Sequence, residues 1–205
     1  MAHDVVLAPG LWMPGAALAP LASRLARAGY LPHVFTYRGR SPLEGNVARF
    51  ARFVRESVAG RPAHFIGHSL GGVLVLEALN SRPELQVASA ILLGAPVRGC
   101  FAGRRFGTAR LGRWMMGACG ELWQEREAVW KRDAPLGVLA GTVPLGLGRA
   151  FGRLPGPNDG VVRVEETAVD GMAARALVPA GHSVLIVSPA VGRQVERFMR
   201  EGRFQ

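Results

Sequence analysis

A serine lies between two glycines at a spacing that suits a nucleophile. Ser69 is the centre of the pattern Gly-His-Ser-Leu-Gly over residues 67–71, between a strand predicted at about 63–67 and a helix predicted at about 70–79. Such a serine must hold its hydroxyl above the sheet on a tight turn, and the two glycines remove side chains that would collide there. The amide of Leu70 would point at the oxyanion formed during attack, at the positive end of the helix dipole. The pattern predicts Ser69 as a nucleophile and Leu70 as an oxyanion donor, in preference to an ordinary glycine-rich turn.

A serine on such a turn needs a base, and one histidine follows it in the chain. In this arrangement the chain order is serine, then acid, then histidine. Four of the five histidines precede Ser69, so His182 is the candidate base, in preference to its being a solvent-facing loop residue.

The acid that would orient His182 is predicted to be Asp159. It follows a strand expected at 136–141 and lies 23 residues before His182. The alternatives are other acidic residues of this part of the chain: Asp133, Asp170, Glu165 and Glu166. Asp133 precedes the strand and would lie at the amino-terminal edge of a parallel sheet. The Asn-Asp-Gly run around Asp159 is also a plain turn signal, so the choice rests on chain position.

The loop after the first predicted strand is the expected source of a second oxyanion donor. It reads Ala-Pro-Gly-Leu-Trp over residues 8–12, and Gly10 would let the backbone approach a substrate. The amide of Leu11 is the candidate donor, and Trp12 beside it is a candidate substrate contact.

Short apolar runs alternate with amphipathic stretches along the whole chain. The runs predict strands at about 5–8, 33–37, 63–67, 88–93, 136–141 and 175–178. The stretches between them predict helices at about 16–28 and 70–79, one between these whose buried face runs from Val47 to Val58 and which stops at Gly60, and a last one from Ser188. Buried strands covered by such helices indicate an α/β protein with a parallel sheet and helices on both faces, in one domain over 1–205.

Residues 97–133 interrupt this alternation and are interpreted as a lid or cap. The segment holds three of the four tryptophans and has a net charge of +4. We expect Trp114 and Met115 to contact a substrate here. An apolar and basic flap of this kind also suits transient contact with a membrane surface. The alternative is two helices that pack their apolar residues into the core, with Glu127 and Lys131 as an ordinary i,i+4 pair.

The composition and charge of the chain indicate which partners and which compartment to expect. The net charge is +10, and 24 of the 25 basic residues are arginine. These arginines fall on the outer faces of several separate helices without a recognised binding module, so no nucleic-acid partner is expected. The uncharged stretch 5–23 is broken by prolines and glycines and follows no basic region, which argues against a targeting segment and favours a cytoplasmic protein. Cys100 and Cys119 are then expected as free thiols, and no metal-ligand spacing occurs.

Together these motifs resemble those of the α/β-hydrolase superfamily, on its lipase and esterase side. The matching runs are GHSLGG at 67–72, LGAPVRG at 93–99, NDGVV at 158–162 and GHSVL at 181–185. The resemblance implies about six parallel strands in the order 2-1-3-4-5-6, without the two strands that normally open the family's sheet. It also implies a cofactor-independent hydrolase that cleaves small or lipid-like carboxylic esters through an acyl-enzyme.

One departure from the family pattern leaves the acyl donor open. Lipases usually carry His-Gly where this chain has Pro9-Gly10. A Pro-Gly pair there is similar to thioesterases that serve carrier-bound acyl chains, so a thioesterase or acyltransferase with the same triad is the alternative. A third possibility is a binding protein that keeps the fold without the chemistry.

Overall fold

The computed structural model describes residues 3–145 and 154–205 of the chain. Six strands form one parallel sheet in the order β2-β1-β3-β4-β5-β6, which confirms the predicted order. The strands are β1 (Asp4–Ala8), β2 (Leu31–Val34), β3 (Ala63–His68), β4 (Val87–Leu93), β5 (Leu136–Gly141) and β6 (Ala174–Val178). Every residue of β1, β3 and β5 is buried, as expected for strands covered on both faces.

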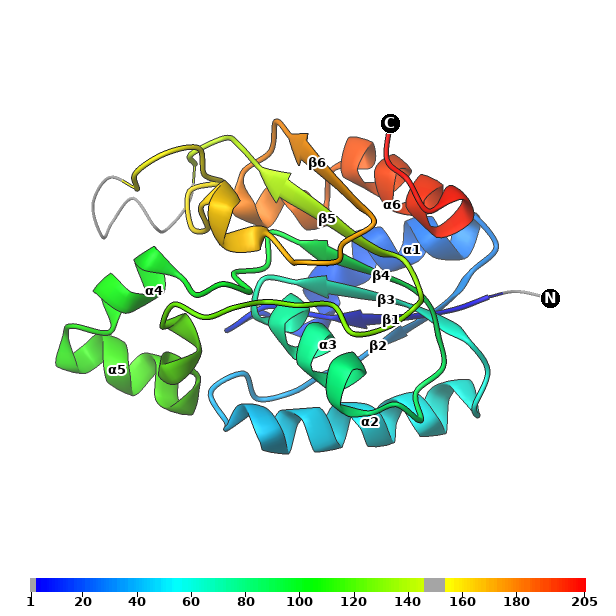
Figure 1. Ribbon diagram of the computed structural model, residues 1–205, viewed down its shortest axis with the longest axis horizontal. Coiled ribbons are helices and arrows are strands. Elements are labelled where there is room, and N and C mark those ends of the chain that lie inside the picture. Colours follow the sequence, from blue (N-terminus) through cyan, green and yellow to red (C-terminus); the bar gives the residue numbers. More distant parts are fainter. Residues whose placement is uncertain (1–2, 146–153) are drawn as a thin grey trace.

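Helices cover both faces of this sheet (Figure 1). The four that do so are α1 (Ala19–Arg27), α2 (Leu43–Val58), α3 (Leu70–Ser81) and α6 (Pro189–Glu201). The apolar sides of α2 and α3 belong to one hydrophobic core, and those of α1 and α6 belong to a second core on the other face. An ion pair of 2.5 Å between Arg24 and Glu196 joins α1 to α6. The result is a three-layer α/β domain whose carboxyl strand ends lie together at one edge.

The second strand and the first helix differ from the prediction. β2 spans Leu31–Val34 instead of 33–37. It is an edge strand in which Leu31 is exposed and the other three residues are partly buried, so no continuous apolar run marks its bounds. Phe35 and Tyr37 lie beyond the strand, and the Phe35 ring packs edge-on against Phe50 of α2 at 5.2 Å. Their apolar character therefore reflects packing under α2. The helix expected from residue 16 begins instead as a 3-10 turn, η1 (Gly15–Leu18), before α1.

Residues 97–133, for which we keep the name lid, leave the sheet after β4. Their helical part lies beyond the carboxyl ends of the strands, and the chain after it runs back past α3 to the start of β5 (Figure 1). It contains α4 (Phe101–Phe106), α5 (Arg110–Met116) and a 3-10 segment, η2 (Gly117–Trp123), followed by extended chain. The alternative of a helical pair between Glu127 and Lys131 is wrong, because these residues lie in the non-helical part. Cys100 and Cys119 are both buried and free. Within the described ranges, no helix is long and apolar enough to cross a membrane.

Candidate active site

Ser69 occupies a strained position between β3 and α3. Its φ is 53° and its ψ is −125°, a region that residues with a side chain rarely adopt and that costs on the order of 1–3 kcal/mol. The flanking glycines are required by space. A Cβ on Gly67 would lie 2.4 Å from the Cα of Gly72, and one on Gly71 would lie 2.2 Å from the carbonyl oxygen of Ala8. The turn that presents Ser69 is therefore enforced by close backbone contacts on both sides.

His182 and Asp159 meet at the same edge of the sheet. The Nδ1 of His182 lies 2.7 Å from Oδ2 of Asp159, whose side chain is almost fully buried. The other oxygen, Oδ1, accepts the amides of Val161 at 2.9 Å and Val162 at 2.7 Å. Because the carboxylate only accepts, Nδ1 of His182 carries the proton and Nε2 is left with a free lone pair. This is the tautomer that a general base requires.

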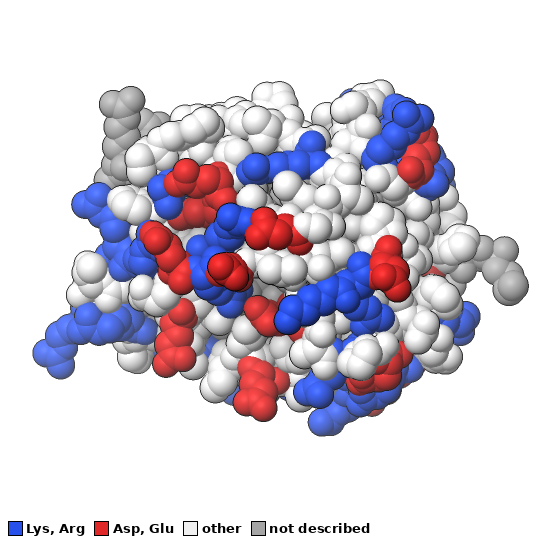
Figure 2. Space-filling model, viewed as in Figure 1, with Lys and Arg blue, Asp and Glu red and all other residues white. Residues whose placement is uncertain are grey.

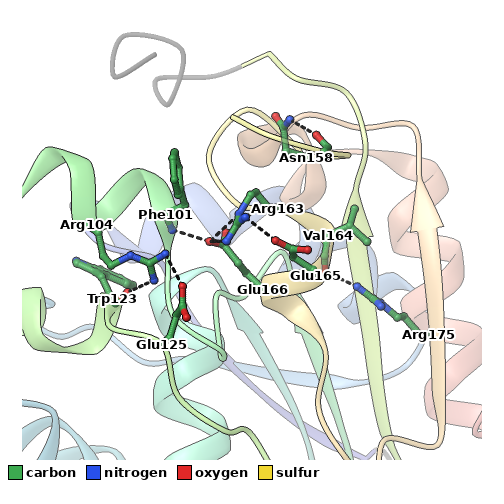
Figure 3. A network of polar contacts seen from close by, with 11 residues as sticks. Phe101, Arg104, Trp123, Glu125, Asn158, Arg163, Val164, Glu165, Glu166 and Arg175 are labelled. Atoms are coloured by element: carbon green, nitrogen blue, oxygen red, sulfur yellow. Dashed lines mark hydrogen bonds and ion pairs between the residues drawn. The ribbon is translucent and has the colours of Figure 1, made fainter. Parts of the chain in front are cut away.

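Two of the alternative acids, Asp170 and Glu166, serve other partners. Asp170 is an exposed carboxylate paired with Arg98. Glu166 is buried, but its oxygens accept the amides of Phe101 at 2.5 Å and Arg163 at 2.8 Å. Figure 3 shows this carboxylate between the first residue of α4 and the loop that follows Asp159. Glu166 therefore attaches the start of the lid to that loop instead of orienting a histidine.

Ser69 and His182 both line one pocket of about 200 Å³. The rest of its wall is mostly apolar and comes from the loop after β1, the lid and the turn after Asp159. These lining residues are Gly10, Leu11, Trp12, Met13, His68, Pro96, Cys100, Ala102, Gly103, Phe106, Met116, Trp123, Val161, Val162 and Ser183. A pocket at the carboxyl ends of parallel strands is the usual place for a ligand in an α/β fold.

Two backbone amides beside Ser69 are available as donors. A Cβ on Gly10 would lie 3.0 Å from the Cβ of Ser69, so the chain at residues 10 and 11 runs against the serine. Leu70 follows Ser69 as the first residue of α3. Among the described residues, no backbone hydrogen bond of a turn, loop or helix cap uses the amide of Leu11 or Leu70. The hydroxyl of Tyr37 donates to the carbonyl of Pro9 at 2.9 Å and holds this loop in place.

The structure separates the three residues expected to contact a substrate. Trp12 lines the pocket, and its Nε1 donates to the carbonyl oxygen of Met115 at 3.1 Å. Trp114 is instead 66% exposed on α5, under the guanidinium of Arg40 at 4.9 Å. Neither Trp114 nor the side chain of Met115 belongs to the wall formed by the described residues. The structure therefore does not bring Trp114 or the side chain of Met115 into this pocket with Ser69 and His182.

Met116 and Trp123 take the place of those two residues in the wall. The buried residues of α5 are Gly112 and Met116, an i,i+4 pair that faces inward. The indole Nε1 of Trp123 donates to the sulfur of Met116 at 3.0 Å. The i,i+4 spacing was the available signal, but it is short and weak in a helix of seven residues.

Cys100 and His68 also line the pocket, and the sequence analysis assigned neither of them to the site. Burial raises the pKa of the Cys100 thiol to about 12, helped by the nearby Glu166 carboxylate. Cys100 is therefore an uncharged thiol and not a competing nucleophile. Burial also lowers the pKa of His68 to about 3, helped by charge on the neighbouring His182. His68 is thus neutral at ordinary pH, and no local spacing marks it as part of a site.

Comparisons with known proteins agree with this geometry. The model of a family described as "Alpha/beta hydrolase family" matches residues 5–200. Among similar solved structures, the mature lipase BlEst2 from Bacillus licheniformis has a TM-score of 0.73 at 18% identity, over 97% of this chain and 91% of that one. A pyrethroid hydrolase from Sphingobium faniae has a TM-score of 0.63 at 15% identity, over 98% of each chain. Phospholipase PlaB from Legionella pneumophila has a TM-score of 0.61 at 18% identity, over 82% of this chain and 46% of that one. At these identities the structural likeness is a shared fold.

Proposed function

Because the chain belongs to the alpha/beta hydrolase family, we propose that it is a serine acyl hydrolase that cleaves carboxylic esters through an acyl-enzyme. The observation that carries the proposal is the 2.7 Å bond between His182 and Asp159 at a pocket that Ser69 also lines. Similar solved structures include a lipase and a pyrethroid hydrolase, both ester-cleaving by name. At their low identity these structures support the fold, so the reaction is argued from the site and the substrate from the pocket.

In the proposed reaction, the hydroxyl oxygen of Ser69 attacks the ester carbonyl carbon while Nε2 of His182 takes the hydroxyl proton. The amides of Leu11 and Leu70 donate to the resulting oxyanion. When the tetrahedral intermediate collapses, the ester C–O bond breaks and the leaving alcohol receives the proton from His182. Water then attacks the acyl-enzyme by the same steps and releases the carboxylic acid. Asp159 holds the tautomer of His182 and stabilises its charged form throughout.

The pocket favours a short or compact, uncharged acyl group. Its volume of about 200 Å³ is below the roughly 300 Å³ at which pockets for drug-sized ligands begin. Its wall contains no Arg, Lys, Asp or Glu among the described residues. We therefore expect acetyl to hexanoyl esters to be turned over faster than long-chain esters.

The outer side of the lid supports transient contact with a lipid surface. Leu111 is 65% exposed and Trp114 66% exposed, and on α5 each directly follows an arginine, Arg110 and Arg113 respectively. Apolar side chains next to cations suit the boundary between headgroups and acyl chains. Elsewhere, Figure 2 shows arginines and carboxylates interspersed over the face in view, without a basic stripe of the kind that follows a nucleic acid.

Covalent labelling and ester turnover test the proposal together. A fluorophosphonate probe should label the wild-type protein and fail to label Ser69→Ala, and p-nitrophenyl acetate turnover should disappear with it. Ser183→Ala is the matched control, because Ser183 also lines the pocket and its loss should leave labelling in place. Labelling that persists in Ser69→Ala would overturn the nucleophile assignment. Turnover of acyl-CoA well above that of matched oxygen esters would replace the esterase by a thioesterase.

A further inference from the structure

A buried histidine directly before Ser69 is bonded to the backbone of the proposed base. His68 is the last residue of β3 and is 1% exposed. Its Nε2 lies 3.0 Å from the carbonyl oxygen of His182, and the two rings pack with centroids 4.7 Å apart. A carbonyl oxygen only accepts, so Nε2 of His68 must carry the proton and donate it.

The other backbone polar group of His182 is held as well. Its amide donates to the carbonyl oxygen of Asp159 at 2.8 Å. The backbone of His182 is therefore fixed on one side by the acid of the proposed triad and on the other by the residue before its nucleophile. Outside these bonds, His182 begins η5 (His182–Ile186), a 3-10 segment on the connection from β6 to α6. A short segment of this kind has little rigidity of its own.

We propose that His68 is a positioning residue, which donates its Nε2 proton to the carbonyl of His182 and thereby holds the imidazole of His182 against Ser69. The inference rests on the proposed function of Ser69 and His182. His68 itself does not touch the reacting atoms; it acts through the backbone of His182.

The second ring nitrogen of His68 indicates that the residue does more than fill space. Nδ1 is buried and has no hydrogen-bond partner among the described residues. It lies 3.3 Å from where a Cβ on Gly10 would be. A leucine would fill this space without burying an unpaired nitrogen, so packing alone does not account for a histidine here. The neutral state of His68 also matters, because a second cation beside His182 would oppose the imidazolium that forms during reaction.

Glutamine and asparagine in place of His68 distinguish a positioning role from a packing role. The terminal nitrogen of glutamine can take the place of Nε2, whereas that of asparagine reaches only the position of Nδ1. We expect His68→Asn and His68→Leu to lower kcat by about 10- to 100-fold with KM within about threefold, because a displaced base slows proton transfer without affecting substrate binding. His68→Gln should restore kcat to within about threefold of wild type. Thermal unfolding of all three variants checks that the folded protein is compared.

Two results would overturn the inference in folded protein: wild-type kcat in His68→Asn, or no advantage of His68→Gln over His68→Leu. If the Asn and Leu variants do not fold, nitrogen NMR of the wild-type histidines decides. His68 must then show a proton on Nε2 and a bare Nδ1, unchanged between pH 5 and pH 8. A proton on Nδ1, or a titration in that range, refutes the bond. Loss of ester turnover or of Ser69 labelling in the wild type would count against the proposed function, whereas the NMR result tests His68 separately.

Discussion

Replacing Asp159 by asparagine should preserve the geometry of the site and reverse the tautomer of His182. In the wild type, Oδ1 accepts two backbone amides and Oδ2 accepts Nδ1–H of His182. Asparagine would keep its carbonyl oxygen on the two amides, since these are fixed donors. Its NH₂ group would then face His182 and make Nδ1 an acceptor. The imidazole proton would move to Nε2, the nitrogen that has to take the proton from Ser69.

The expected loss is large because the base is blocked and not merely displaced. An Asp-to-Asn change at the acid of a Ser-His-Asp triad lowers kcat by about 10⁴-fold, which corresponds to about 5.4 kcal/mol of transition-state stabilisation at about 1.36 kcal/mol per factor of ten. Stability should change little, because the two amide bonds to Oδ1 are retained. We expect KM to stay within about threefold, since the lining of the pocket is unchanged.

Steady-state kinetics on p-nitrophenyl acetate measure this loss, with thermal unfolding to verify the fold. Asp170→Asn is the matched control. Asp170 is the main rival acid, its side chain is 64% exposed, and it pairs with Arg98 away from His182. Its replacement should change kcat by less than about threefold, as expected for a surface ion pair. A kcat for Asp159→Asn within tenfold of wild type, or a larger loss in Asp170→Asn, would refute the assignment of the acid.

Three further substitutions test the oxyanion loop, the wall of the pocket and the buried carboxylate at the start of β1. Gly10→Ala places a Cβ 3.0 Å from the Cβ of Ser69, which should displace the oxyanion loop and lower kcat about 10- to 100-fold. Ester kinetics measure this change, and an unchanged kcat would contradict the assignment of the loop. Met116→Ala removes part of the pocket wall and should move the preferred p-nitrophenyl ester to longer chains, at a cost of about 2–5 kcal/mol measured by urea unfolding; an unchanged chain-length profile contradicts it. Although burial works to raise the pKa of Asp4, hydrogen bonds, chiefly from Arg61, lower it overall. The folded state therefore binds a proton on the Asp4 carboxylate less readily than the unfolded state does. Asp4 stabilises the fold at pH values above its unfolded pKa of about 3.9, and this stabilisation is lost as the pH falls through the folded pKa. Urea unfolding between pH 6 and pH 2.5 should show the loss of stability in the wild type and a smaller loss in Asp4→Asn.

The sheet could be predicted from local sequence because its constraints are local. Fully buried strands such as β3 appear as unbroken apolar runs, and the turn at Ser69 needs glycines where a Cβ would strike backbone. β2 was misplaced by two residues at its start and three at its end, since an edge strand carries no clear apolar pattern and Phe35 beyond it is apolar for another reason. Strand order followed from the resemblance and not from any residue in the strands themselves.

The candidate site was only partly accessible from sequence. Chain order admits both Asp159 and Asp170 as the acid, and the bond between Asp159 and His182 is a contact across 23 residues that no spacing rule supplies. The pocket wall depends on how two short lid helices pack, so Trp114 and Met116 could not be told apart by residue type. His68 was hidden for a different reason: its importance lies in a backbone carbonyl 114 residues away.

The excess of arginine over lysine acquires a structural explanation from the irregular segments of the fold. Short helices and extended chain leave many carbonyl oxygens without intrahelical partners, and a guanidinium offers five donors in a planar fork, against three on one nitrogen in lysine. Arg132 uses this capacity at the end of α3, where it donates to the carbonyls of Leu79, Arg82, Pro83 and Leu85. In the lid, Arg104, Arg113 and Arg126 each donate to at least one carbonyl oxygen of the same segment. Part of the positive charge of the lid therefore serves to hold short helices and extended chain together, whereas Arg110 of α5, next to the exposed Leu111, is placed for the proposed contact with a negatively charged surface.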